Sequence, residues 1–183
     1  MRFGKEQKVA AAIGPLLLDQ DPDVGLAALF VIGMFGADAD MATPQLQRVL
    51  LTGDVFSPHL GAHVFAPDIA CEAISRIGPG AAQAIQQMIQ VIQTPPAGHG
   101  LSPSACVRAL GKMGNTQPDV ISTLLATLKS SDINMRNGAA SALSTLPIWS
   151  EEIQGSLQRA VQREPDSVEL EDALETVRSR RSR

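Results

Sequence analysis

Hydrophobic residues recur at helical spacing along most of the chain, in pairs of short segments separated by turn residues. The pattern is strongest in 104–129, where each half carries one apolar stripe with positions three or four residues apart. Gly114 stands between the halves, where a helix needs a left-handed residue to end. Pro118 fits the first turn of the next helix, with Thr116 as its N-cap and Asp119 completing a capping box. The pattern therefore predicts two short helices joined by a tight turn.

A short signature ends the first helix of each pair. The signature is six residues long: its first residue is small or apolar, its second and fifth are apolar, and its sixth is glycine or proline. A weaker copy lies near the C-terminus. The second positions of the signature are Ile32, Ile74, Leu110, Leu143 and Leu174, which are 42, 36, 33 and 31 residues apart. A single helical hairpin cannot bury both of its stripes and needs a neighbour on each side. A period of about 30–45 residues with helical patterning is therefore typical of two-helix solenoids.

The openings of two pairs carry a resemblance to a known family. Asp21-Pro22-Asp23-Val24 runs into Ile32-Gly33, and Asp132-Ile133-Asn134-Met135-Arg136 runs into Ala139-Ala140. Both resemble the first helix of a HEAT repeat. The resemblance implies an all-α fold, a right-handed α-solenoid of about four to five two-helix HEAT-like repeats. The second and third repeats lack this opening, and long loops containing Gly, Pro and His precede them.

We expect a single HEAT-like domain over 1–183. A capping helix at about 5–18 begins it, and Gly14-Pro15 should bend or break that helix. The four repeats span about 22–52, 68–93, 104–129 and 132–163, and a terminal helix follows at about 166–180.

The segment 53–67 is expected to be a long loop, and it is unusually apolar for one. It contains Val55, Phe56, Val64 and Phe65. These side chains either pack back on the solenoid or are offered to a partner, and packing is the favoured interpretation.

Composition narrows the possible functions. The net charge is −4 and aromatic residues make up 3% of the chain, which argues against a general phosphate-backbone binder, so nucleic acid is not an expected partner. Cys71 and Cys106 each lie on the first helix of a repeat and are expected to be reduced, buried thiols. No apolar run reaches the roughly 20 residues of a membrane span, and the N-terminus is too polar for a secretory signal. We therefore expect a cytoplasmic protein that does not bind membranes.

Three histidines are the candidate metal ligands. His63 and His99 are 36 residues apart, as are Pro67 and Pro103, so the two loops occupy equivalent positions in consecutive repeats. With His59 they would place three imidazoles on one edge of the array, enough for a zinc or nickel site. The simpler interpretation is that these are exposed loop histidines.

No nucleophile motif, phosphate loop, Cys-x-x-Cys or His-Glu-x-x-His occurs, so neither an enzyme nor a cofactor is expected. HEAT-like deoxyhypusine hydroxylases use His-Glu pairs, and no histidine here precedes a glutamate. HEAT-like alkylpurine glycosylases have basic, aromatic-lined faces, which an acidic chain poor in aromatics lacks. A role like that of the HEAT-like phycobilin lyase subunits stays open as the alternative, together with metal binding.

The resemblance places the second helices on a concave surface. The residues it would present are polar and mostly uncharged: Gln45, Arg48, Gln83, Gln86, Gln87 and Gln90. Such a surface suits a peptide or helix from a partner protein, although glutamine is also simply a good polar helix former. The predicted function is a non-enzymatic protein–protein interaction scaffold. The sequence indicates neither the identity of the partner nor the oligomeric state.

Overall fold

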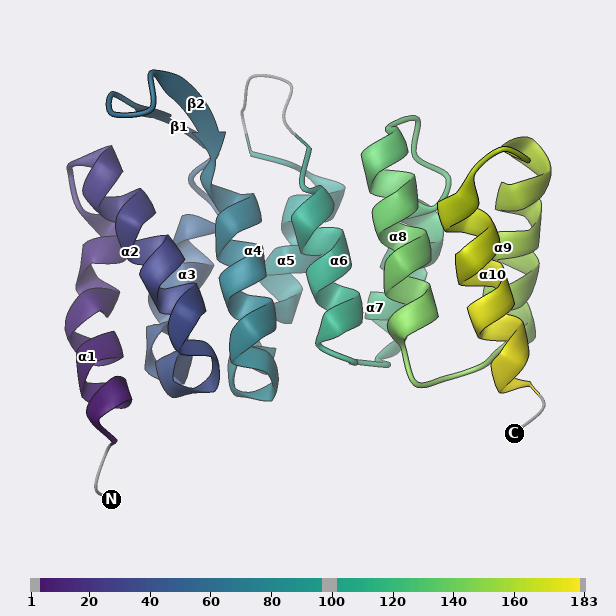
Figure 1. Ribbon diagram of the computed structural model, residues 1–183, viewed down its shortest axis with the longest axis horizontal. Helices are drawn as coiled ribbons and strands as arrows, with labels where there is room; N and C mark the ends of the chain where they lie inside the picture. Colours follow the sequence, from purple (N-terminus) through teal and green to yellow (C-terminus); the bar gives the residue numbers. More distant parts are fainter. Residues whose placement is uncertain (1–3, 97–101, 182–183) are drawn as a thin grey trace. The chain divides into compact units, whose positions relative to one another are not determined.

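The computed structural model describes residues 4–96 and 102–181 (Figure 1). Helices dominate, and within these residues strands occur only in one hairpin. The prediction of a mainly helical fold is therefore confirmed. The chain forms two compact units, residues 1–106 (unit 1) and residues 107–183 (unit 2). The repeat anchors Ile32, Ile74, Leu110 and Leu143 are fully buried in the cores.

Unit 1 is built from two helix pairs and a capping helix. Its elements are α1 (Lys5–Ile13), the 3-10 helix η1 (Gly14–Leu18), α2 (Pro22–Phe35), η2 (Gly36–Ala42), α3 (Thr43–Val49), β1 (Asp54–Ser57), β2 (Ala62–Phe65), α4 (Ala66–Ile77), η3 (Gly78–Ala84), α5 (Ile85–Gln93) and the start of α6 (Ser104–Lys112). Helix α2 packs against α4, and α3 and α5 lie behind them in Figure 1. The unit therefore has two layers of helices, with the α3–α5 layer carrying the predicted polar surface.

The two helix pairs share one turn geometry, which follows from the repeated glycine. Gly36 ends α2 with a φ of 53° and Gly78 ends α4 with a φ of 72°, both in the left-handed region that glycine adopts readily. A seven-residue 3-10 segment begins at each glycine, so the second helix begins at Thr43 or Ile85. The predicted break at Gly14-Pro15 is also present, because α1 ends at Ile13.

Residues 54–65 form a β-hairpin, where the sequence predicts a loop. Val55 pairs with Val64 and Phe56 with His63, and Gly61 in the turn has a φ of 62°. Phe65 is buried, whereas Phe56 keeps 49% of its surface exposed. Only some of the apolar side chains of this segment therefore pack against the helices, as the sequence predicted for all of them. The prediction failed because two four-residue strands are too short for alternation to stand out between turn residues.

Asp23 fixes the hairpin to α2. Its carboxylate accepts hydrogen bonds from the Ser57 hydroxyl and from the backbone N–H of His59, which lies 3.1 Å away. In Figure 1 the hairpin projects past the ends of α2 and α4.

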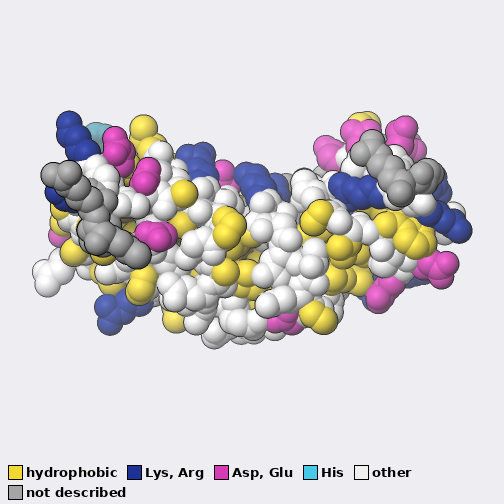
Figure 2. Space-filling model, turned by 90° about the horizontal axis from the view of Figure 1, so that it is seen from below, with side chains coloured by type: hydrophobic (Ala, Val, Ile, Leu, Met, Phe, Trp, Pro, Cys, Tyr) yellow, Lys and Arg dark blue, Asp and Glu magenta, His cyan; other side chains and the backbone are white. Residues whose placement is uncertain are grey.

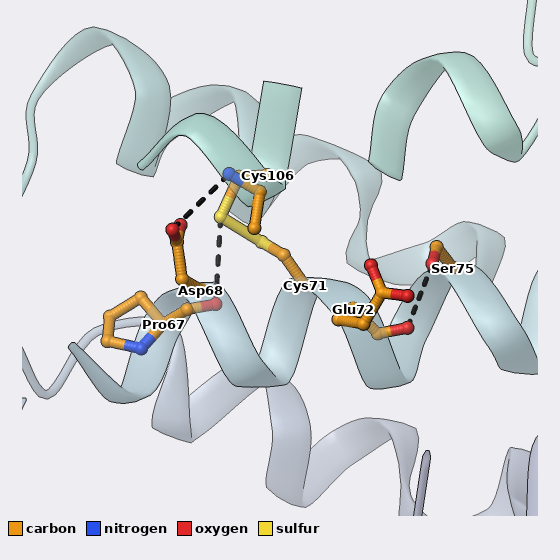
Figure 3. The surroundings of a disulfide bond; sticks show 7 residues. Pro67, Asp68, Cys71, Glu72, Ser75 and Cys106 are labelled. Carbon is orange, nitrogen blue, oxygen red and sulfur yellow. Dashed lines mark hydrogen bonds between the residues drawn. A yellow bond between two sulfur atoms is a disulfide. The ribbon is translucent and has the colours of Figure 1, made fainter. Parts of the chain in front are cut away.

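Cys71 and Cys106 form a disulfide, which corrects the prediction of reduced thiols (Figure 3). The bond joins α4 to the first turn of α6, with a Cα–Cα distance of 4.8 Å across 35 residues. Beside it the Ala105 N–H donates to Asp68 Oδ2 at 3.3 Å. The prediction assigned each cysteine separately, whereas equivalent positions on consecutive first helices bring the two sulfur atoms within bonding distance.

Unit 2 contains the rest of α6 and four further helices, which are α7 (Pro118–Thr127), α8 (Ile133–Thr145), α9 (Glu151–Arg163) and α10 (Val168–Arg180). Helix α8 packs against α7 and α10, and α10 packs against α9. Side chains of Asp132, Ser150 and Ser167 cap α8, α9 and α10. The predicted Thr116 cap is wrong, because Gln117 is the N-cap of α7 and the Asn115 side chain accepts its N–H instead.

Among the described residues one helical stretch, Pro22–Val49, has the length and hydropathy of a membrane span, with a mean hydropathy of 1.6. It comprises α2, η2 and α3, and the chain turns at Gly36. Core helices of water-soluble proteins and N-terminal signal sequences share this length and composition, so the stretch carries no conclusion about a membrane.

Candidate functional site

The predicted glutamine surface lies on α3, η3 and α5 of unit 1. Helix α5 turns Ile85, Met88, Ile89 and Ile92 into the core, which leaves its glutamines on the opposite side. Gln83, Gln86 and Gln90 are exposed there, and Gln87 is half-buried. Figure 2 is turned by 90° from Figure 1 and shows the lower ends of the helices rather than this surface; uncharged atoms, white and yellow, cover most of that view.

Gln47 connects the two helix pairs on this surface. Its Nε2 donates to the Gln83 carbonyl and to Gln87 Oε1, both at 3.0 Å. These contacts hold the Gln87 side chain against α3. Sequence reasoning missed Gln47, although its offsets of 36 and 40 residues from the two partners lie in the range of the repeat spacing.

A pocket of about 400 Å³ opens beside this contact, and we call it the α3–α5 pocket. It is lined by Pro44, Gln45, Gln47, Arg48, Leu51 and Gln87. The structure thus brings together three of the six predicted residues, namely Gln45, Arg48 and Gln87. The other three, Gln83, Gln86 and Gln90, lie on the same surface but do not line the pocket.

The pocket offers three different kinds of contact. Gln45 Oε1 is buried and accepts no hydrogen bond from the described part of the chain. Arg48 is exposed and has no ion-pair partner among the described residues, and the Leu51 side chain is 53% exposed. The pocket therefore combines a buried acceptor, a cation and an aliphatic surface.

The histidines lie on the hairpin or outside the described residues. His59 is in the turn, and His63 on β2 places its ring 5.2 Å from that of Phe56. His99 lies outside the described residues. In residues 4–96 and 102–181 no three His, Cys, Asp or Glu side chains are grouped closely enough to hold a metal ion. The three-histidine site therefore stays a prediction, as does the lyase-like alternative.

No protein-family model matches the sequence, and no curated protein matches it. Among solved structures the chain is similar to the crystal structure of an engineered protein from the Northeast Structural Genomics Consortium. The TM-score is 0.58 with 16% sequence identity, covering 93% of this chain and 79% of that chain. Likeness at this identity concerns the fold alone and supports the helical architecture.

Proposed function

We propose that this chain is a HEAT-like, non-enzymatic protein-binding module whose α3–α5 pocket holds a segment of a partner protein. The observation that carries the proposal is the buried Gln45 Oε1. Buried polar atoms in native proteins nearly always have a hydrogen-bond partner, because an unpaired one costs about 1–3 kcal/mol. Because this oxygen is buried in the unbound chain, the Gln45 side chain must turn towards the pocket for a backbone N–H of a bound segment to supply that partner.

Two further features support a polypeptide ligand. Gln47 is held by two hydrogen bonds, so this side of the pocket is ordered before binding, which lowers the entropic cost of association. The exposed Leu51 gives an aliphatic contact next to the polar groups. Because Arg48 is the one charged residue that lines the pocket, the affinity should depend mainly on hydrogen bonds and apolar contact, and only weakly on salt.

Affinity capture from the native source tests the proposal, with the parent chain compared with two single variants. Gln45→Met removes the buried acceptor at nearly constant volume, and Gln90→Met makes the same change on the same surface outside the pocket. We expect one protein to be enriched by the parent and by Gln90→Met, and to fall about tenfold with Gln45→Met. Equal capture by all three proteins, or specific capture by none, would contradict the pocket's role.

A further inference from the structure

A different pocket, in unit 2, concentrates positive charge, and we call it the basic pocket. It has a volume of about 340 Å³ and lies between the C-terminal ends of α7 and α9. Leu125 and Leu128 form its apolar side, and Lys129, Arg159 and Arg163 form its cationic side. The remaining lining residues are uncharged, so no acidic side chain lines this pocket.

This concentration of charge is local. Unit 1 has five basic and nine acidic residues and so accounts for the whole net charge of −4. Unit 2 has ten of each and is neutral overall. An acidic partner would therefore be repelled by unit 1 and attracted to this part of unit 2.

The neighbouring acids do not offset the three cations. Glu164 is bound by Arg136, with Nε–Oε1 and Nη2–Oε2 distances of 2.7 Å and 2.8 Å. Asp132, the N-cap of α8, is not a lining residue of the pocket. The C-terminal dipoles of α7 and α9 contribute about half a negative charge each, which is less than the three positive charges of the lining side chains.

The two arginines keep most of their donors for a ligand. Arg159 Nη2 donates to the buried Ser156 hydroxyl at 3.0 Å, which orients its guanidinium. Arg163 Nε donates to the Arg159 carbonyl at 3.4 Å. Neither forms an ion pair with another described residue, and a guanidinium carries five N–H donors in all.

We propose that the basic pocket binds an acidic peptide segment of a partner protein. A carboxylate contacts Arg159 and Arg163, and a neighbouring aliphatic side chain lies against Leu125 and Leu128. Guanidinium groups bind carboxylates through paired, charge-assisted hydrogen bonds, and the apolar side adds a contact that a phosphodiester backbone would not use. The net negative charge of the whole chain also disfavours a long polyanion. The site is separate from the α3–α5 pocket and does not rest on it.

An NMR titration of the full chain tests the proposal. The probe is an acetylated, amidated peptide Gly-Leu-Glu-Glu-Leu-Gly, and its twin carries glutamine in place of both glutamates. We expect saturable shifts at the C-terminal ends of α7 and α9, and about tenfold weaker binding of the glutamine twin. Arg159→Glu should weaken binding of the acidic peptide by at least about tenfold, because it removes a cation and adds a repelling charge.

Two variants serve as controls. Arg178→Glu makes the same charge change on the exposed side of α10, and Gln45→Met alters only the α3–α5 pocket. Both variants should bind the peptide with an affinity within about twofold of the parent's. The proposals for the basic pocket and for the α3–α5 pocket are therefore tested independently. The proposal is wrong if no saturable shift occurs up to about 1 mM peptide, or if Arg178→Glu weakens binding as much as Arg159→Glu. Tighter binding of an eight-nucleotide oligouridylate would also overturn it.

Discussion

Gly111 on α6 lies where α8 comes closest to it. A Cβ at this position would stand 2.4 Å from Ala142 Cα and 2.7 Å from Ala142 Cβ. Gly33 stands in the same position of the signature and faces Ala73 on α4, where a Cβ would be 3.5 Å from the Ala73 Cα. Small residues at the signature positions thus let consecutive first helices pack closely.

Gly111→Ala should therefore destabilise the protein. Because the added methyl group meets backbone as well as side chain, α6 and α8 must separate, and we expect a loss of about 2–3 kcal/mol in the free energy of unfolding. Urea denaturation measures the change.

Gly155→Ala is the matched control. Gly155 lies inside α9, and a Cβ there would only touch Arg159 Nη1 at 3.5 Å. We expect this variant to gain about 0.5–1 kcal/mol from the better helix propensity of alanine. If Gly111→Ala behaves like Gly155→Ala, the close approach of the two helices is wrong.

At the level of elements, Arg136 joins three parts of unit 2. Its Nη1 donates to the Ser130 and Ser131 carbonyls at 2.9 Å and 2.8 Å, and it pairs with Glu164 at the end of α9. The arginine and glutamate side chains are 15% and 30% exposed, so the pair is only partly screened by solvent.

Arg136→Met should lower the free energy of unfolding by about 2 kcal/mol, because two carbonyls and a carboxylate lose a charged donor. Glu164→Gln should cost less, since the carbonyl contacts remain. Chemical denaturation of the two single variants and the double variant gives the coupling energy between them. A coupling near zero would show that the pair contributes nothing to stability.

The Cys71–Cys106 disulfide should stabilise the folded chain. In the loop-entropy picture, a bond across 35 residues stabilises the folded chain by up to about 4 kcal/mol. Reductant should therefore lower the guanidinium midpoint of the parent chain. The variant with Cys71→Ser and Cys106→Ser should have the lower midpoint with or without reductant. Two titratable thiols in the purified, unreduced and denatured parent chain would contradict the bond.

The sequence predicts the helices well because their signals are local. Gly114 has a φ of 64° and Pro118 begins α7, as the turn chemistry requires. The hairpin was missed because its four-residue strands are too short to show alternation, whereas the disulfide was missed because it depends on which distant segments meet in three dimensions. Gln47 was missed for the same reason, since only its contacts with Gln83 and Gln87 distinguish it from other polar helix residues.

At the scale of the whole molecule, the two pockets differ in charge and should respond differently to salt. Raising the salt concentration from about 50 to 500 mM should weaken acidic-peptide binding at the basic pocket several-fold, because exposed charges are screened within a few ångströms. Partner capture through the α3–α5 pocket should change little over the same range. Equal salt sensitivity at both sites would contradict the assignment of one weakly charged pocket, with a single cation, and one strongly basic pocket.

The disulfide also bears on where the protein works. Stable disulfides are typical of oxidising compartments, whereas the sequence predicts a cytoplasmic location. Thiol labelling in the native source, before and after reduction, distinguishes an oxidising compartment from the cytoplasm.

Photo-cross-linking from position 51 tests directly whether a partner segment occupies the α3–α5 pocket. A photoreactive residue replaces the exposed Leu51 in the full chain, and cross-linked peptides from the native source are identified by mass spectrometry. We expect one partner segment to be cross-linked at this position, and the cross-link to be lost when Gln45→Met is added. Cross-links to many unrelated proteins, or an unchanged yield with Gln45→Met, would show that the α3–α5 pocket is ordinary polar surface.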